Sequence, residues 1–308
     1  MTGDKPLAIT GGTGFVGRAV LDVLRERRIP TGALARKVPD EPFEAIEWVR
    51  GDLGDDAALA RLASGSGALI HIAGLTNTPD PAEFEGANVT GTANVIAAAK
   101  AARVKRLVFV SSLAAREPQL SRYGASKSQA EQLVQASGLD WTIVRPPAVY
   151  GPRDSDMFDL FRAARFGFVP LPPGGATSII HVEDLARLLL DLVTAQSALV
   201  SKRIFEPDDG REGGWSHKEL AHAIGQSVGR KIIAPHLPRA VLQGAASIDR
   251  LLRGDGAKLT ADRVGYMCHP NWVARFDRQV PETVWTPQIG GEAGLAATAE
   301  WYRSAGWF

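Results

Sequence analysis

Short apolar runs alternate with amphipathic stretches through the first half of the chain. Six apolar runs predict strands, at residues 7–10 (LAIT), 31–36, 45–53, 68–74, 106–112 and 141–147. Apolar residues at helical spacing predict intervening helices at 15–27, 55–63, 82–102 and 121–137. Continuous apolar strands separated by helices are typical of a parallel sheet covered on both faces. We therefore predict an α/β fold of the Rossmann type, a doubly wound parallel sheet.

The pattern loosens beyond residue 150. Residues 151–177 contain a helix and a Pro/Gly-rich loop, and a strand at 178–181 followed by a helix at 182–194 predicts a return to the main sheet. The remainder mixes short helices with Pro and Gly breaks. We predict a dinucleotide-binding domain at 1–150, to which 178–205 returns. Residues 151–177 and 206–308 are expected to form a smaller, interleaved substrate lobe.

Composition narrows the function classes. The 308 residues are 45% hydrophobic and 22% charged, as in ordinary globular proteins. A formal net charge of +1 creates no strong global field, so we expect no nucleic-acid partner. The single cysteine and six histidines show no ligand spacing, which predicts no metal site. A strand that begins almost at once leaves no room for a signal peptide, and no run of ~18 apolar residues is present, so we expect a cytoplasmic protein.

A glycine-rich turn follows the first apolar run. Gly11, Gly14 and Gly17 stand in GGTGFVG, between the predicted strand and helix. Glycine there permits a tight turn, close approach of the backbone to a pyrophosphate, and close packing of helix on strand. The helix start also offers free N–H groups to an anion. At the first strand-to-helix junction of an alternating fold, this turn predicts a dinucleotide site.

The end of the second strand bears on the choice between NADP and NAD. An NAD site usually has an acidic residue there for the ribose 2′-OH. This chain has Arg36 and Lys37 instead, and an arginine can bind a 2′-phosphate with two hydrogen bonds. We expect NADP, with NAD as second choice; the alternative is that both cations belong to a solvated loop. Asp52 is expected to bond the adenine amino group, its alternative role being a helix cap.

A tyrosine and a lysine one helical turn apart are the candidate catalytic residues. In YGASK, Tyr123 and Lys127 would share one helix face. A neighbouring ammonium is expected to lower the phenol pKa, which makes the phenol a usable proton donor or acceptor. Ser112 ends the fifth strand, where its hydroxyl can donate to a developing oxyanion. Ser111 is kept as a neighbour that contacts the cofactor or supports the structure.

The chain resembles an extended or atypical member of the short-chain dehydrogenase/reductase superfamily. The matching stretches are TGGTGFVG, GDL, HIAG, NVTGTANV, VFVSS, YGASK, RPPAVYGP and HVEDLA. The resemblance implies a Rossmann-type fold and the same roles for Ser112, Tyr123 and Lys127. It also implies that Asn88 and Pro146 lie near the cofactor, and that a homodimer forms through the helices at 82–102 and 121–137. The expected cofactor contacts are Gly11, Thr13, Gly14, Phe15, Val16, Gly17, Arg36, Lys37, Asp52, Leu53, Ala73, Gly74, Ser111, Tyr123, Lys127, Pro146 and Val149.

One departure from the family pattern bears on the activity. Sugar-nucleotide epimerases and dehydratases carry an asparagine soon after the sixth strand, where this chain has RPPA at 145–148. Its absence resembles the ketone-reductase branch. We therefore expect a reductase, with a sugar-nucleotide epimerase or dehydratase and a non-catalytic dinucleotide-binding subunit as alternatives.

The segments expected to line the substrate pocket are apolar. Residues 75–87, 113–122, 147–180 and 206–216 contribute Phe84, Met157, Phe158, Phe161, Phe166, Phe168 and Leu171. Residues 236–254 form an amphipathic stretch, which either packs on the lobe, the favoured alternative, or contacts a membrane surface. We expect the substrate to be a bulky hydrophobic ketone such as a keto-sphingolipid, reduced at the inner face of a membrane or in the cytoplasm.

Overall fold

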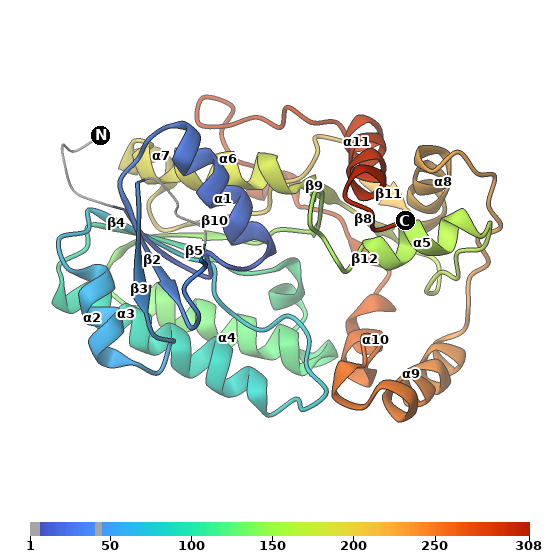
Figure 1. The fold of residues 1–308 in the computed structure, drawn as a ribbon, viewed down its shortest axis with the longest axis horizontal. Helices are drawn as coiled ribbons and strands as arrows, with labels where there is room; N and C mark the ends of the chain where they lie inside the picture. Colours follow the sequence, from blue (N-terminus) through green and yellow to red (C-terminus); the bar gives the residue numbers. More distant parts are fainter. Residues whose placement is uncertain (1–6, 41–44) are drawn as a thin grey trace.

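A twisted parallel sheet forms one half of the protein in a computed structural model, which describes residues 7–40 and 45–308 (Figure 1). In the described chain the sheet has seven strands in the order β10-β6-β5-β4-β1-β2-β3. Their bounds are β1 Leu7–Thr10, β2 Thr31–Ala35, β3 Ile46–Arg50, β4 Ala68–His71, β5 Arg106–Val110, β6 Asp140–Val144 and β10 Arg203–Phe205. All are parallel. The order of β1 to β6 is the dinucleotide-binding order, so the predicted fold is confirmed.

Helices cover both faces of this sheet. On one face lie α1 (Phe15–Glu26) and α6 (Val182–Thr194), which share an apolar core with β1 and β5. On the other lie α2 (Asp56–Ala63), α3 (Gly91–Ala101) and α4 (Arg122–Ala136). The helix expected at 82–102 begins instead as a π-helical turn, η1 (Glu85–Thr90), before α3. Such turns occur often at functional sites.

The second half is a lobe of short elements around its own core. Two small sheets lie in it, β7 (Ala148–Tyr150) with β9 (Ile179–His181), and β11 (Trp215–Ser216) with β8 (Ala176–Thr177) and β12 (Asn271–Trp272). The longer helices are α5 (Phe158–Arg165), α8 (His217–Ser227), α9 (Arg239–Arg253), α10 (Ala261–Met267) and α11 (Gly291–Ser304). The shorter helices of the chain are η2 (Leu113–Arg116), η3 (Pro118–Leu120), α7 (Ser197–Val200), η4 (Gly254–Gly256) and η5 (Phe276–Arg278). Of these, η2 and η3 lie beside α4, and α7 belongs to the sheet half.

Two expectations about the rear half are wrong in detail. The strand predicted at 178–181 pairs with β7 and does not rejoin the seven-stranded sheet; α6 and β10 make the return. Conversely, Val280 and Trp285, which fall in the segment assigned to the lobe, pack in the core beneath α1 and α6. The chain therefore crosses between the halves more often than its pattern indicates, and the proposed division into a domain and a lobe stays a prediction.

Two observations concern the chain's relation to a membrane. No helix in the described ranges is both long and apolar enough to cross a bilayer. The residues ahead of β1, on which the expectation about a signal peptide depends, lie outside the described residues.

Candidate active site

The turn between β1 and α1 requires glycine for two separate reasons. Gly11 has a φ of +79°, and a Cβ atom there would lie 2.6 Å from the Ala73 amide nitrogen at the end of β4. A Cβ on Gly17 would collide with the carbonyl oxygen of Gly11. These two glycines therefore let α1, β1 and β4 approach one another closely.

Gly14 is different because no crowding within the protein requires it. It is exposed, has a φ of −80°, and a Cβ there would make an ordinary contact of 3.4 Å. Gly14 is also the N-cap of α1, which has no side-chain cap and no acidic residue in its first turn. The open space and the uncapped helix start fit a pyrophosphate, which would accept hydrogen bonds from the amides of Phe15 and Val16.

The residues expected to bind the adenosine end lie at the carboxyl ends of β2 and β3. Arg36 and Lys37 are exposed immediately after β2, and neither forms an ion pair or a side-chain hydrogen bond with another described residue. Asp52 is exposed after β3, where its carboxylate accepts the Gly54 amide at 2.8 Å. The cap of α2 is Asp55, so the alternative that Asp52 caps a helix is wrong. Leu53 is held by Asn94, whose amide donates to its carbonyl at 2.8 Å.

The segment after β4 is fixed by Asn88. Its carboxamide accepts the Leu75 amide at 2.8 Å and donates to the Leu75 carbonyl and the Ser126 hydroxyl. A Cβ at Gly74 would lie 2.8 Å from this carboxamide oxygen and 3.9 Å from the Lys127 ammonium. Ala73 is tied to β1, because its amide donates to the Thr10 hydroxyl. Asn88 thus holds the small residues after β4 beside the catalytic helix.

The proposed catalytic hydroxyls lie together at the carboxyl end of β5. Ser112 follows β5, where its hydroxyl accepts the Ala114 amide at 3.2 Å and lies near enough to the Tyr123 phenol, in the first turn of α4, to act on the pKa of that group. The Ser121 hydroxyl caps α4 by accepting the Gly124 amide at 2.9 Å. Gly124 is required because a Cβ there would lie 2.7 Å from the Ala114 carbonyl oxygen. Pro146, after β6, accepts the Leu113 amide, so it supports this turn from below.

Lys127 lies one turn beyond Tyr123 and is also buried. Its ammonium donates to the Val110 carbonyl at 2.8 Å and lies 4.4 Å from the centre of the Phe109 ring. Burial lowers the pKa of Lys127 to about 8, and the Glu131 carboxylate acts in the opposite direction. The ammonium therefore begins to lose its proton just above neutral pH.

The expected lowering of the Tyr123 pKa is wrong for the protein alone. Burial raises the pKa of the phenol, and the nearby Ser112 hydroxyl only partly opposes this. The apolar surroundings of Leu75, Phe84 and Tyr266 account for the burial, since these side chains form a cluster with Tyr123. A raised pKa keeps the phenol protonated, which is the form needed to donate a proton to a ketone oxygen.

A buried network of charges supports the same edge from behind. Ser111 points away from Ser112 and donates to Glu131 at 2.5 Å. Glu131 also accepts two hydrogen bonds from Arg145, at 2.6 and 2.9 Å. Arg145 and Arg116 both pair with Glu206, whose side chain is fully buried. The side chain of Ser111 thus has the structural role that was one of its two predicted roles. Arg145, the first residue of the RPPA segment, forms buried ion pairs with Glu131 and Glu206.

The geometry agrees with what comparison with known proteins finds. A family model described as NAD(P)H-binding matches residues 11–196. A ceramide reductase of Caulobacter vibrioides is 36% identical, over 98% of this chain and 95% of the relative. The chain belongs to the NAD(P)H-binding short-chain dehydrogenase/reductase family. It is an oxidoreductase with a nicotinamide dinucleotide as cofactor.

Two further comparisons place this dehydrogenase/reductase among its relatives. A 4-hydroxy-2-methyl-3-oxo-4-farnesyl-3,4-dihydroquinoline-1-oxide ketoreductase of Stigmatella aurantiaca is 35% identical, over 59% of this chain and 62% of the relative. The solved structure of MoeE5 in complex with UDP-glucose and NAD has a TM-score of 0.75 at 24% identity, covering 97% of this chain and 99% of that one. This structural likeness shows the fold alone. The resemblance noted from the sequence is confirmed.

The sequence analysis missed the part of the active site supplied by α10. The Asp262 carboxylate accepts the backbone amides of Arg122 and Tyr123, at 2.5 and 3.2 Å. The ring of Tyr266 lies 5.9 Å from that of Tyr123. Gly265 allows this approach, because a Cβ there would collide with the Leu120 carbonyl oxygen. The tyrosine and the small residue in DRVGYM were visible signals, but their spacing alone could not place them against α4.

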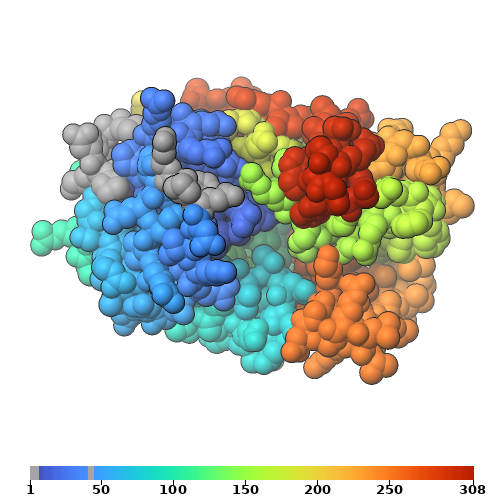
Figure 2. Space-filling view, in the orientation of Figure 1, coloured from blue at the N-terminus to red at the C-terminus, as the bar shows by residue number. Residues whose placement is uncertain are grey.

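Most aromatic residues assigned to the substrate pocket lie elsewhere. Phe84 contacts Tyr123, as expected. The others are in the lobe's own core or on its surface: Met157, Phe158, Phe161 and Leu171 pack in the core, and Phe166 and Phe168 are exposed. Figure 2 shows the surface hollowed between the blue and cyan N-terminal half and the orange segment that includes α10. We expect substrate to enter there.

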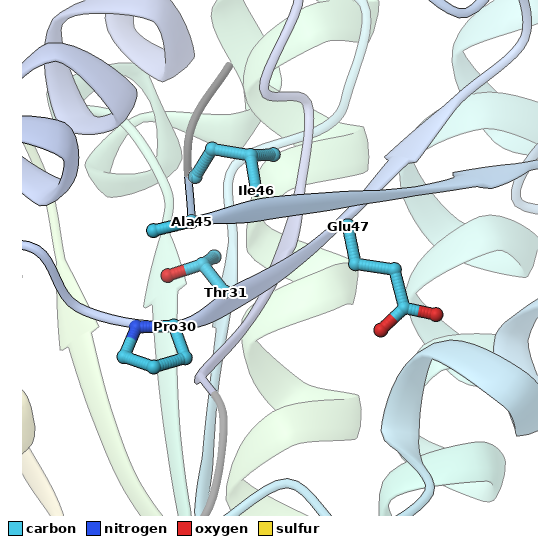
Figure 3. A pocket seen from close by; sticks show the side chains of 5 residues that line it. All are labelled: Pro30, Thr31, Ala45, Ile46 and Glu47. Atoms are coloured by element: carbon cyan, nitrogen blue, oxygen red, sulfur yellow. The ribbon is translucent and has the colours of Figure 1, made fainter. Parts of the chain in front are cut away.

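A separate hollow lies at the opposite end of the sheet (Figure 3). It has a volume of about 290 Å³ and is lined by Pro30 and Thr31 at the start of β2, by Ala45 just before β3, and by Ile46 and Glu47 at the start of β3. Parallel sheets bind ligands at the carboxyl ends of their strands, so this hollow is not part of the dinucleotide site. Among the described residues, no group of three or more His, Cys, Asp or Glu could hold a metal ion.

Proposed function

We propose that this chain reduces a ketone on a bulky, lipid-like substrate to a secondary alcohol, with NADPH as the hydride donor. The observation that carries the proposal is the buried Tyr123 phenol, which lies near Ser112 and packs against the apolar side chains of Leu75, Phe84 and Tyr266. A proton donor bounded by apolar groups suits a carbonyl on a hydrophobic molecule.

In this mechanism bound NADPH supplies a hydride to the carbonyl carbon. Ser112 donates a hydrogen bond to the carbonyl oxygen as negative charge develops on it. Tyr123 transfers its phenol proton to that oxygen. The carbonyl carbon thus gains a C–H bond from the hydride and the oxygen gains an O–H bond, while the C=O double bond becomes a single bond. The positively charged ammonium of Lys127 stabilises the resulting Tyr123 phenolate. The Glu131 carboxylate favours the charged form of Lys127. The position of Lys127 beside Gly74 also suits a hydrogen bond from its ammonium to the nicotinamide ribose.

The preference for NADPH rests on Arg36 and Lys37. Both are exposed at the end of β2, where a 2′-phosphate would lie against them. Replacing Arg36 by Ala should raise the Michaelis constant for NADPH by roughly tenfold and leave that for NADH nearly unchanged. Lys218→Ala, an exposed cation on α8, is the matched control. A clear preference of the unmodified protein for NADH would reject this assignment.

The proposed substrate is a keto-sphingolipid, the ketone related to a ceramide. The relatives named as a ceramide reductase and a farnesyl-quinoline ketoreductase support a long apolar substrate. The decisive experiment compares thermal stabilisation and NADPH oxidation by a panel of lipid ketones and nucleotide sugars. We expect stabilisation and turnover with the lipid ketones only. Stabilisation by UDP-glucose alone would favour an epimerase or dehydratase, and cofactor binding without turnover on any ketone would favour a non-catalytic subunit.

A further inference from the structure

Helix α9 exposes its apolar face to solvent. Val241, Ala245, Ile248 and Leu252 recur at helical spacing on one side, and Leu251 extends that side. The relative exposures are 50% for Val241, 59% for Ile248, 84% for Leu251 and 77% for Leu252. The favoured expectation, that this helix packs on the lobe, is confirmed for the helix but not for this face, because other residues of α9 make the contact with α10.

The contact between α9 and the rest of the protein is made by a different side of the helix. Leu242 and Ala246 are buried against Val264 of α10, together with the partly buried Leu237 and Leu259. Figure 1 shows α9 and α10 at the end of the molecule away from the sheet. The helix is thus held in place without using its most apolar side chains.

A second exposed apolar group lies in the segment that leads into α9. Ile233 exchanges backbone hydrogen bonds with Gly167 and Val169, beside Phe166 and Phe168. Seven of the nine exposed large hydrophobic side chains in the described chain belong to this group or to α9: Phe166, Phe168, Ile233, Val241, Ile248, Leu251 and Leu252. Both groups are thus exposed apolar surface, and large exposed apolar patches are typical of sites where a protein contacts another protein or a membrane.

The charges in this region are mostly positive. Residues 229–253 contain five lysines or arginines and one acid, whereas the whole chain has a net charge of +1. Arg253 pairs with Asp249, which leaves Arg230, Lys231, Arg239 and Arg250 without an ion pair to another described residue. Arg239 and Arg250 lie on the side of α9 opposite Val241, as in helices that bind at bilayer surfaces.

A second copy of the chain fits this surface poorly. A helix of 15 residues is about 22 Å long and presents a strip about 10 Å wide, which is well short of the roughly 800 Å² per partner that stable dimers bury. Pairing two copies through α9 would also bring cations against cations. The homodimer that we propose from the family resemblance, through α3 and α4, would leave α9 uncovered.

We propose that α9 docks this protein on the surface of an anionic lipid bilayer, with Val241, Ile248, Leu251 and Leu252 entering the headgroup region. The docked helix is one layer from the active site, because α10 links the α9 contact at Val264 to Tyr266 beside Tyr123. A hydrophobic ketone could thus pass from the bilayer to the site without crossing water. This proposal rests on the proposed function, because docking on a bilayer would bring the enzyme to a lipid substrate. Binding to the bilayer can nevertheless be measured without turnover.

The test is flotation of the purified full chain with vesicles in a density gradient. Vesicles of phosphatidylcholine are compared with vesicles that also contain phosphatidylglycerol. The variant Val241→Glu/Leu252→Glu removes apolar contacts and adds two negative charges. Gln243→Glu/Ser247→Glu adds the same charges on the polar side of α9 and is the matched control. Thermal unfolding reports whether each variant is folded, so this control does not depend on turnover.

We expect the unmodified protein to float with the anionic vesicles and the first variant to lose at least about tenfold of that binding, whereas the control variant retains most of it. Equal flotation of both variants, or no flotation of the unmodified protein, would overturn the docking proposal. So would a dimer in sedimentation velocity, formed without vesicles, that the first variant abolishes. If flotation behaves as expected while no lipid ketone is turned over, the docking stands and the proposed function fails.

Discussion

Helices α4 and α9 both have fifteen residues, but their sequences and surroundings are opposite. Helix α4, RYGASKSQAEQLVQA, is mostly polar and shows little amphipathicity, and yet seven of its residues are buried. Helix α9 has a well-separated apolar face, and yet only two residues of the whole helix are buried, Leu242 and Ala246. Both segments were predicted to be helices, but the prediction that α9 packs on the lobe did not indicate that its apolar face would stay exposed.

Both helices depart from the usual rule that polar residues are exposed and apolar residues are buried. Helix α4 departs from it at the candidate active site, and we propose that α9 departs from it where the protein meets a bilayer. The polar groups of α4 are buried because every one needed at the site has a partner, such as Ser112 for Tyr123 and Val110 for Lys127. The apolar groups of α9 have no comparable partner among the described residues.

The largest expected effect comes from removing the α4 phenol. Tyr123→Phe should lower kcat by roughly 10²- to 10⁴-fold, because proton donation to the ketone oxygen is lost. NADPH binding, measured by fluorescence titration, should change little. Tyr266→Phe is the matched control, since it removes a neighbouring phenol from α10 and should change the Michaelis constant more than kcat. Full activity in Tyr123→Phe would remove the main reason for treating α4 as the catalytic helix.

Glu131→Gln should affect both stability and pH dependence. Removing one partner of a buried ion pair leaves Arg145 poorly compensated and should cost about 3 kcal/mol of unfolding free energy, measured by urea denaturation. Glu300→Gln, in an exposed pair with Arg303, should cost about 0.5 kcal/mol or less.

The pH profile follows from Lys127. Because its pKa is lowered to about 8, the ammonium form is lost as pH rises through that value, and the rate of ketone reduction should fall there. The Glu131 charge raises this pKa, so Glu131→Gln should move the decline in kcat to lower pH. An unchanged decline in that variant would show that the activity does not depend on the Lys127 charge.

Asp262→Ala should have a moderate effect that connects the two regions. It removes the carboxylate from α10 that caps the start of α4, and should cost about 1 kcal/mol of stability. Asp55→Ala removes the cap of α2 at a similar cost. Only Asp262→Ala should also impair steady-state turnover, because it frees the turn that carries Tyr123. Equal kinetics in the two variants would mean that α10 does not position Tyr123.

The smallest effect is expected on the exposed face of α9. Leu252→Glu should change the unfolding free energy by about 0.5 kcal/mol or less, since the side chain is largely in solvent. Leu242→Ala, on the buried side of the same helix, should cost about 2 kcal/mol. A large loss of stability in Leu252→Glu, seen in thermal unfolding, would indicate that this face is covered within the protein.

Local patterns predicted much of the sheet and part of the site. The strands from β1 to β6 follow from continuous apolar runs, and the glycine turn follows from Gly11, Gly14 and Gly17 at a strand-to-helix junction. Ser112, Tyr123 and Lys127 could be selected because their order along the chain matches their positions at one edge of the sheet. Their catalytic roles stay predictions.

Long-range contacts could not be predicted in the same way. Asp262 and Tyr266 reach α4 from about 140 residues away, and nothing in their local sequence specifies that partner. The aromatic residues of α5 were assigned to a pocket because apolar composition does not distinguish a core from a binding site. The raised pKa of Tyr123 depends on Phe84 and Tyr266, which only the fold brings together.

The arrangement around Glu206 has a consequence for the order in which the protein matures. During synthesis, the strands that carry the glycine turn emerge early, whereas Glu206 and the carbonyls of Asn271 and Val273 that bind Arg116 emerge late. The glycine turn is therefore synthesised well before the residues that hold Arg116 at the catalytic edge. The catalytic edge should thus be among the last parts of the protein to reach its final geometry.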